Sequence, residues 1–231
     1  MDGGYIASCH LGEANSQTSH GIAVSFALDD RVILSITSSM AEYPIIFDAN
    51  AIRSLLAGNK TQTRLLATSP LRECKPGDRL WVKEACAGGR IPDGQSREHF
   101  SAIRKAEFVV FVDGWRRHRS GHGHAGSVPT SRKLEWTPAI HMPRWASRAT
   151  LVIESVRLEP LQSINRRDFV IEGQFATFVG LLWRWRKPIR GLWRDPRRAF
   201  AAIWNATHGT SGERWEDNPD IVVLSFRVER Q

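Results

Sequence analysis

The sequence predicts an α+β fold in which several β-strands form a barrel, with peripheral helices and a long inserted loop region. Three observations lead to this prediction. Short apolar strands recur between turn signals, amphipathic helices are few, and strands do not alternate regularly with helices as they would around a parallel sheet. The chain has 231 residues, of which 42% are hydrophobic, so it can bury one substantial core.

The first recognisable elements are an apolar strand at 42–47 and an amphipathic helix at 49–57. Asp48 stands where its side chain can accept hydrogen bonds from the free amide groups of the first helical turn. The apolar residues of the helix recur at the spacing that places them on one face. Gly58 then supplies the left-handed residue that ends many helices. We therefore expect a strand followed by a capped helix.

The rest of the chain shows further elements, each bounded by turn residues. The expected strands are 79–84, 106–112, 148–158 and 220–229. The expected helices are 164–173 and 197–207. Residues 87–104 and 116–133 lack periodicity and are rich in glycine or charge, which predicts loops. These loops make up most of an insertion at about 87–135.

Residues 1–41 are rich in Ser, Gly and Ala and contain one plausible strand. We expect this extension to be poorly ordered or dispensable, and residues 42–231 to form the domain. No apolar run approaches the roughly 20 residues needed to cross a bilayer, and the N-terminus lacks the pattern of a signal peptide. These features predict a cytoplasmic protein without membrane contact.

The cysteines are odd in number and lack CxxC spacing, so they are interpreted as ordinary thiols rather than as a disulfide framework or a zinc site. His118, His122 and His124 gather in a Gly-rich stretch, but no carboxylate or cysteine accompanies them at ligand spacing. A basic loop explains these histidines better than a metal site does. We expect no metal and no cofactor.

A formal net charge of +8 favours polyanionic partners, because Lys and Arg that bind phosphates release counterions. In residues 183–194, tryptophans interleave with Arg184, Arg186 and Arg190. This composition suits single-stranded nucleic acid. A partly buried linker with exposed arginines is the alternative.

A second group of aromatic and basic residues is Arg144, Trp145 and Arg148, which stand close together near one turn. These side chains could stack on a base and clamp a phosphate. They could equally be a tryptophan that plugs the end of the barrel, with arginines at the surface. The sequence leaves both interpretations open.

Four blocks of the sequence, in this order, are similar to the ASCH family, especially to a longer version common in phage and prophage genomes. The blocks are 44–64, which ends in Lys60-Thr61-Gln62-Thr63-Arg64, then 77–84, 141–148, and 171–173 with the closing strand 218–226. The resemblance covers about residues 42–229. It implies a PUA-like β-barrel with a cleft, a fold associated with RNA modification and RNA binding.

The resemblance also implies a ligand and a site. One small bacterial member of the superfamily is an amidohydrolase that removes the acetyl group from 4-acetylcytidine, using a Lys, a Thr and a Glu. Lys60, Thr63 and Glu172 stand at the matching positions. RNA or a modified nucleoside is therefore the expected partner, and Arg64 is expected to contact nucleic acid.

Amide hydrolysis needs a nucleophile, a base and a proton donor for the departing amine. Thr63 would attack or orient a water, Lys60 in its neutral form would be the base, and Glu172 would orient Lys60 or carry a proton. Residues three apart converge only on a bend, so Lys60 and Thr63 require one after Gly58. The alternative is a non-catalytic nucleic-acid-binding or accessory phage module.

Overall fold

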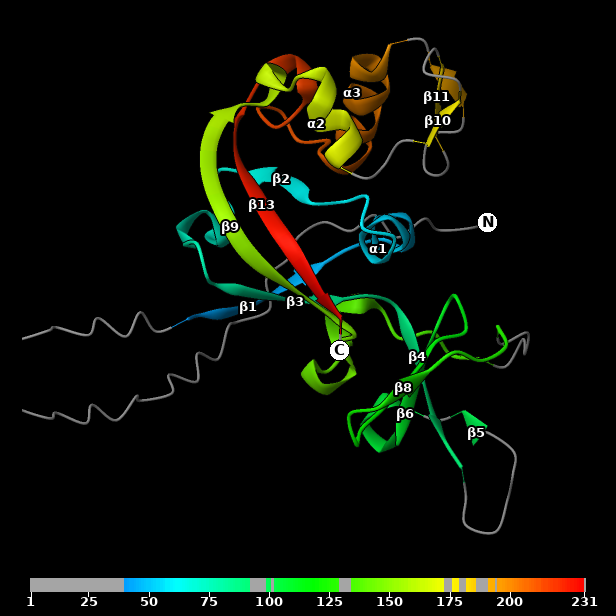
Figure 1. The fold of residues 1–231 in the computed structure, drawn as a ribbon. Helices are drawn as coiled ribbons and strands as arrows, with labels where there is room; N and C mark the ends of the chain where they lie inside the picture. The colour runs from blue at the N-terminus through cyan, green and yellow to red at the C-terminus, as the bar shows by residue number, and fades with distance from the viewer. Residues whose placement is uncertain are drawn as a thin grey trace, which may run out of the picture.

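The computed structural model describes residues 40–91, 99–100, 102–128, 134–172, 176–178, 182–185, 191–193 and 195–230. It shows an α+β chain with three sheets and few helices (Figure 1). The α+β class expected from the sequence is therefore confirmed. The strand expected within 1–41 lies outside the described residues.

The central sheet has five strands in the order β1, β3, β9, β13, β2. Their bounds are β1 (Glu42–Ile46), β2 (Gln62–Leu66), β3 (Arg79–Lys83), β9 (Ala149–Pro160) and β13 (Asp220–Arg230). β1 pairs with β3 in parallel, and the other neighbours are antiparallel. The order ends at β1 and β2, and among the described strands no ladder joins these two edges. The described strands therefore do not form the closed barrel that the sequence predicts.

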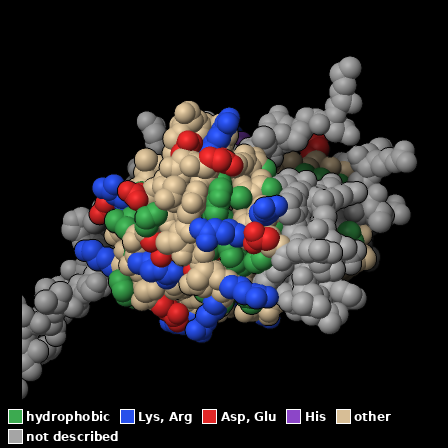
Figure 2. Space-filling view, turned by 90° about the horizontal axis from the view of Figure 1, so that it is seen from above, with side chains coloured by type: hydrophobic (Ala, Val, Ile, Leu, Met, Phe, Trp, Pro, Cys, Tyr) green, Lys and Arg blue, Asp and Glu red, His purple; other side chains and the backbone are tan. Residues whose placement is uncertain are grey.

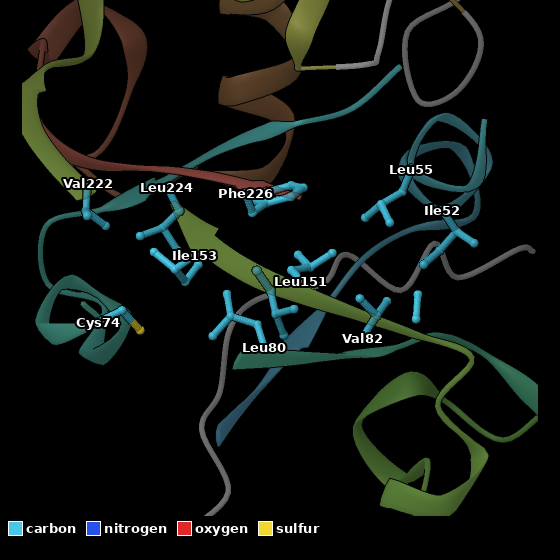
Figure 3. Close-up of a cluster of buried hydrophobic side chains, with 12 residues drawn as sticks. Ile52, Leu55, Cys74, Leu80, Val82, Leu151, Ile153, Val222, Leu224 and Phe226 are labelled. Atoms are coloured by element: carbon cyan, nitrogen blue, oxygen red, sulfur yellow. The ribbon is translucent and has the colours of Figure 1, made fainter. Parts of the chain in front are cut away.

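The helix α1 (Ala49–Leu56) covers one face of this sheet, where the main apolar core lies (Figure 3). Ile52 and Leu55 point from α1 toward strand residues such as Leu151. The predicted cap is confirmed, because the Asp48 side chain accepts a hydrogen bond from the Ala51 amide at 2.7 Å. Local sequence signals thus specify the helix that closes this side of the core.

The other face of the sheet carries a second apolar cluster beneath α2 (Arg166–Ile171) and α3 (Pro196–Thr207). β13 supplies both clusters, because successive residues of a strand point to opposite faces. Val222 and Leu224 belong to the main core, whereas Ile221 and Val223 belong to the second cluster. Residues of the neighbouring strand β2 can therefore be assigned to one of these two faces.

The second sheet has the antiparallel order β5, β4, β6, β7, β8, and it lies below the central sheet in Figure 1. Its strands are β4 (Cys86–Arg90), β5 (His99–Phe100), β6 (Phe108–Phe111), β7 (Arg116–His118) and β8 (Gly123–His124). The loops predicted at 87–104 and 116–133 are wrong where β4, β5, β7 and β8 lie. One reason is Gly89, where an added Cβ would stand 2.4 Å from the Phe108 ring, so the strand requires glycine for close packing.

Shorter elements complete the chain. A third sheet is formed by the backbones of β10 (Ala176–Phe178), β11 (Leu182–Trp185) and β12 (Gly191–Trp193), so the predicted linker at 183–194 contains strands. The 3₁₀ turns are η1 (Pro70–Glu73), η2 (Ile103–Lys105), η3 (Ala139–His141), η4 (Arg144–Ala146), η5 (Leu161–Ser163) and η6 (Trp215–Asp217). None of the described helices has the length and apolar character required to cross a membrane.

Candidate functional site

Lys60 stands on the bend that the sequence requires after α1. Gly58 has a φ of 76°, the left-handed conformation that L side chains rarely adopt. The amides of Asn59 and Lys60 both donate to the Ser54 carbonyl, at 2.9 and 3.2 Å. The chain then forms an isolated β-bridge between Lys60 and Glu172 at the end of α2. The bend therefore brings together two residues that are 112 positions apart.

The Lys60 ammonium is enclosed and fully hydrogen-bonded. Its residue exposure is 1%. Its Nζ donates to the Gln62 carbonyl at 2.8 Å, to the Glu172 carbonyl at 2.9 Å and to the Glu172 Oε2 at 3.0 Å. An ammonium has three protons, and a neutral amine has only two. The three acceptors around Nζ therefore match the three protons of an ammonium, and all of them belong to the protein.

Arg64 joins the same cluster from β2. Its Nη1 donates to Glu172 Oε1 at 2.6 Å, and its Nη2 donates to Asp168 at 2.9 Å and to Glu159 at 3.1 Å. Arg157 lies within 3.1 Å of Glu159, which completes three cations and three carboxylates. With its side chain 1% exposed, Arg64 has no guanidinium surface to offer a phosphate. The expected nucleic-acid contact of Arg64 is not supported by this geometry.

Asp168 links the charge cluster to the start of α2. The Asn165 side chain accepts from the Asp168 amide at 3.0 Å, and the Asn165 amide donates back to Asp168 Oδ2 at 3.1 Å. This reciprocal pair is a capping box, which satisfies amides at the beginning of a helix. The same Asp168 oxygen accepts from Arg64. The cluster therefore fastens α2 to β2 and holds Glu172 at the other end of the helix.

Thr63 lies on the other face of β2. It pairs with Leu224 of the main core, whereas Arg64 pairs with Val223 of the second cluster. Paired residues of neighbouring strands share a face, and consecutive residues alternate. The structure therefore brings Lys60 and Glu172 together, as predicted, but directs Thr63 away from the face on which Arg64 binds Glu172.

Arg148 forms a second buried ion pair, at the junction of the two larger sheets. Its Nε and Nη2 donate to the two carboxylate oxygens of Glu84 at 2.7 and 2.8 Å, and Nη1 donates to Asp113 at 2.8 Å. Its guanidinium also lies 4.2 Å from the Phe111 ring centroid. A planar fork matched to a carboxylate in this way is a strong, directional contact. Arg148, predicted to clamp a phosphate, is occupied by these carboxylates.

Burial decides the titration of several buried groups. It raises the pKa of Glu84, and the hydrogen bond and charge of Arg148 offset that rise only in part. It also raises the pKa of the Cys74 thiol to about 11 and that of Cys86 to about 12. Both cysteines are free and buried, so they remain protonated and act as the ordinary thiols expected from the sequence.

A basic and aromatic surface, named here the Trp81 surface, comprises Trp81, Lys83, Arg119, Arg144 and Trp145. Lys83 Nζ lies 5.2 Å and the Arg144 guanidinium 5.6 Å from the Trp81 ring centroid. The Arg119 guanidinium lies 4.6 Å from the Trp145 ring centroid. Both tryptophans are half-buried and keep an accessible part. The surface therefore combines stackable rings with cations.

Arg144 is the member of this surface that the sequence predicted to bind nucleic acid, together with Trp145. Its side chain is 41% exposed. Its Nη2 donates to both carboxylate oxygens of Glu42, at 3.0 and 3.2 Å. An exposed pair of this kind is weak and is readily exchanged for another anion. The structure thus leaves Arg144 and Trp145 available, unlike Arg64 and Arg148.

The remaining predicted residues fall in less informative places. Arg184 belongs to β11, but its side chain is not described, and Arg186 and Arg190 lie outside the described residues. His118 stacks on His122 with ring centroids 4.3 Å apart. No group of three potential metal ligands occurs in the part of the chain that the structure describes.

A groove of about 590 Å³ runs along α3 and η6. Its lining residues are Asp195, Arg197, Arg198, Ala201, Ala202, Asn205, Trp215 and Glu216. Acidic and basic side chains are interspersed across the face of the molecule seen from above (Figure 2). The groove likewise mixes two acids with two arginines, so it has no electrostatic preference for a polyanion.

Comparisons with known proteins identified no family for this chain. No protein-family model matches the chain, and neither curated proteins nor solved structures gave a match.

Proposed function

We propose that this chain is an ASCH-type domain of the PUA-like fold that binds single-stranded RNA through its Trp81 surface without hydrolysing it. The fold part of the proposal rests on the four sequence blocks and on the α+β architecture, in which α1 connects the two edge strands of a five-stranded sheet. The long β9 curves strongly along its length (Figure 1), as strands do in barrel-like sheets.

The Trp81 surface is the main support for the proposal of RNA binding. A base can stack on an aromatic ring whatever its sequence, and nearby cations attract the phosphates between bases. Trp81 has Lys83 and Arg144 over its ring, and Trp145 has Arg119 over its ring. The net charge of +8 adds a long-range attraction of the same sign.

Replacing Lys83 and Arg144 together with alanine is expected to weaken binding of a single-stranded RNA of about 12 nucleotides by about tenfold. The slope of log affinity against log salt concentration should become shallower by about 0.7 for each phosphate that the variant no longer neutralises. Fluorescence anisotropy of a labelled RNA at several salt concentrations measures both quantities.

The matched control is the pair Arg72→Ala and Lys75→Ala, which removes the same charge from exposed positions in and just after η1. Equal weakening by the two double variants would show that only net charge matters. Absence of binding by the unmodified chain at low salt would remove the proposal altogether.

Hydrolysis of an acylated cytidine is the second candidate, because the structure joins Lys60 to Glu172 at 3.0 Å. We expect no acetate release from 4-acetylcytidine, since Lys60 Nζ already donates to three protein oxygens and Thr63 faces the core side of β2. Chromatography of the nucleoside after incubation tests this. Turnover that disappears in the Thr63→Val variant, which keeps the shape of the side chain, would restore the enzymatic hypothesis.

A further inference from the structure

Arg117 is a buried arginine that has no acceptor among the described residues. Four arginines in the described residues are buried, and their exposures are 6–8%. Arg64, Arg116 and Arg148 donate to carboxylates or backbone carbonyls. For Arg117, at 8% exposed, no hydrogen bond or ion pair is found among the described residues, and its Nε is enclosed with no partner. An enclosed donor without a partner is costly, so the Arg117 Nε can still donate to an acceptor that the described chain does not provide.

The register of the second sheet explains where Arg117 lies. It pairs with Val109, whose side chain belongs to the apolar cluster that Met142 and Ala146 also form. Arg117 is therefore on the face of β7 that the segment from η3 to η4 covers. Arg119, two residues further along, is on the same face and contacts Trp145. Arg117 thus lies between the second sheet and the Trp81 surface.

The electrostatic environment of Arg117 includes Arg144. Burial lowers its pKa, and the positive charge of Arg144 lowers it further. Arg144 is consequently near enough for its charge to act on Arg117. Arg117 and Arg144 therefore create a local positive potential beside the accessible ring of Trp145.

We propose that Arg117 and Arg144 together hold a phosphate group of the bound RNA, while Trp145 receives an adjacent base. This inference rests on the proposed function and identifies the part of the surface that binds the phosphate backbone of the RNA. Arginine suits the task, because its rigid fork of donors matches two phosphate oxygens. Arg144 would exchange the exposed Glu42 for the phosphate, and Arg117 would gain the acceptor that it lacks.

Thermal melts in inorganic phosphate test the anion site without RNA. At matched ionic strength and at about five times its dissociation constant, phosphate should raise the Tm of the unmodified chain by about 2–4 °C relative to chloride. The Arg117→Gln variant should show no such rise, and in chloride it should melt no lower than the unmodified chain, because it removes an unpaired charge. Arg72→Gln, at an exposed position, should keep the full phosphate response.

RNA binding then separates this inference from the proposed function. Arg117→Gln should bind the RNA about tenfold more weakly, with a salt slope shallower by about 0.7. Arg117-dependent stabilisation by phosphate without RNA binding would retain the anion site and reject the RNA reader. RNA binding and phosphate response that are both unchanged in Arg117→Gln would overturn the inference. If Arg117→Gln does not fold, Arg144→Gln replaces it, because that side chain is 41% exposed.

Discussion

Replacing Glu172 with alanine is expected to lower the free energy of unfolding by about 3–5 kcal/mol. The substitution leaves the Lys60 ammonium and the Arg64 guanidinium inside the protein, each with its side chain 1% exposed, and removes the carboxylate that accepts from both. Neither cation can reach water without opening the contact between β2 and α2. Urea unfolding followed by circular dichroism measures the decrease in stability.

The control for this experiment is Glu154→Ala, an exposed glutamate of β9, which should change the stability by less than about 0.5 kcal/mol. A decrease below about 1 kcal/mol for Glu172→Ala would show that the cluster is solvated in solution and that Lys60 is free to act. The result also bears on function, because a Glu172 variant that loses activity by unfolding says nothing about catalysis. Stability must therefore be measured before any activity of such a variant is interpreted.

Replacing Arg148 with methionine is expected to lower the free energy of unfolding by a similar amount, about 3–5 kcal/mol, because it leaves the buried Glu84 carboxylate without its partner. Asp113, whose side chain is 38% exposed, can remain hydrated and contributes less to the decrease. Adding Glu84→Leu to the same chain should restore most of the stability, since the charge and its partner are then both removed. Urea unfolding of the two variants gives the comparison.

Arg104→Ala, at an exposed position in η2, is the matched control and should be nearly neutral. The RNA affinity of the double variant should equal that of the unmodified chain, because Arg148 is bound to carboxylates rather than available to a phosphate. If the restored protein still binds RNA more weakly and with a shallower salt slope, Arg148 does contact the nucleic acid, as the sequence suggests. Failure of Glu84→Leu to restore stability would instead show that the loss in Arg148→Met does not come from an unpaired, buried Glu84 carboxylate.

Local sequence signals were sufficient for elements whose physical causes are local. Asp48 caps α1 and Gly58 ends it, as predicted, because capping and left-handed stops depend on a few neighbouring residues. The strands β1, β3, β9 and β13 followed from apolar runs between turns. β2 was missed, because its residues Gln62 to Arg64 are polar and buried only through partners that are distant in the sequence.

The second sheet was missed for the same kind of reason, except for β6, which lies within the strand expected at 106–112. Gly89 lowers strand propensity, yet the Phe108 ring needs the space that a side chain would fill. Arg116 and Arg117 have the composition of a loop, but β7 pairs with β6 and buries both. Propensity describes a residue alone, whereas these strands exist because of their partners.

By itself, the sequence determined the fold class, the capped first helix, and a pairing of Lys60 with Glu172 that the family resemblance implied. Only the tertiary structure decided what that pairing means. It showed that Lys60 is enclosed and has no proton free, that Thr63 faces the other side of β2, and that Arg117 has no acceptor among the described residues. The availability of a charged group depends on the burial and partners that distant segments impose, and composition and spacing do not encode these contacts.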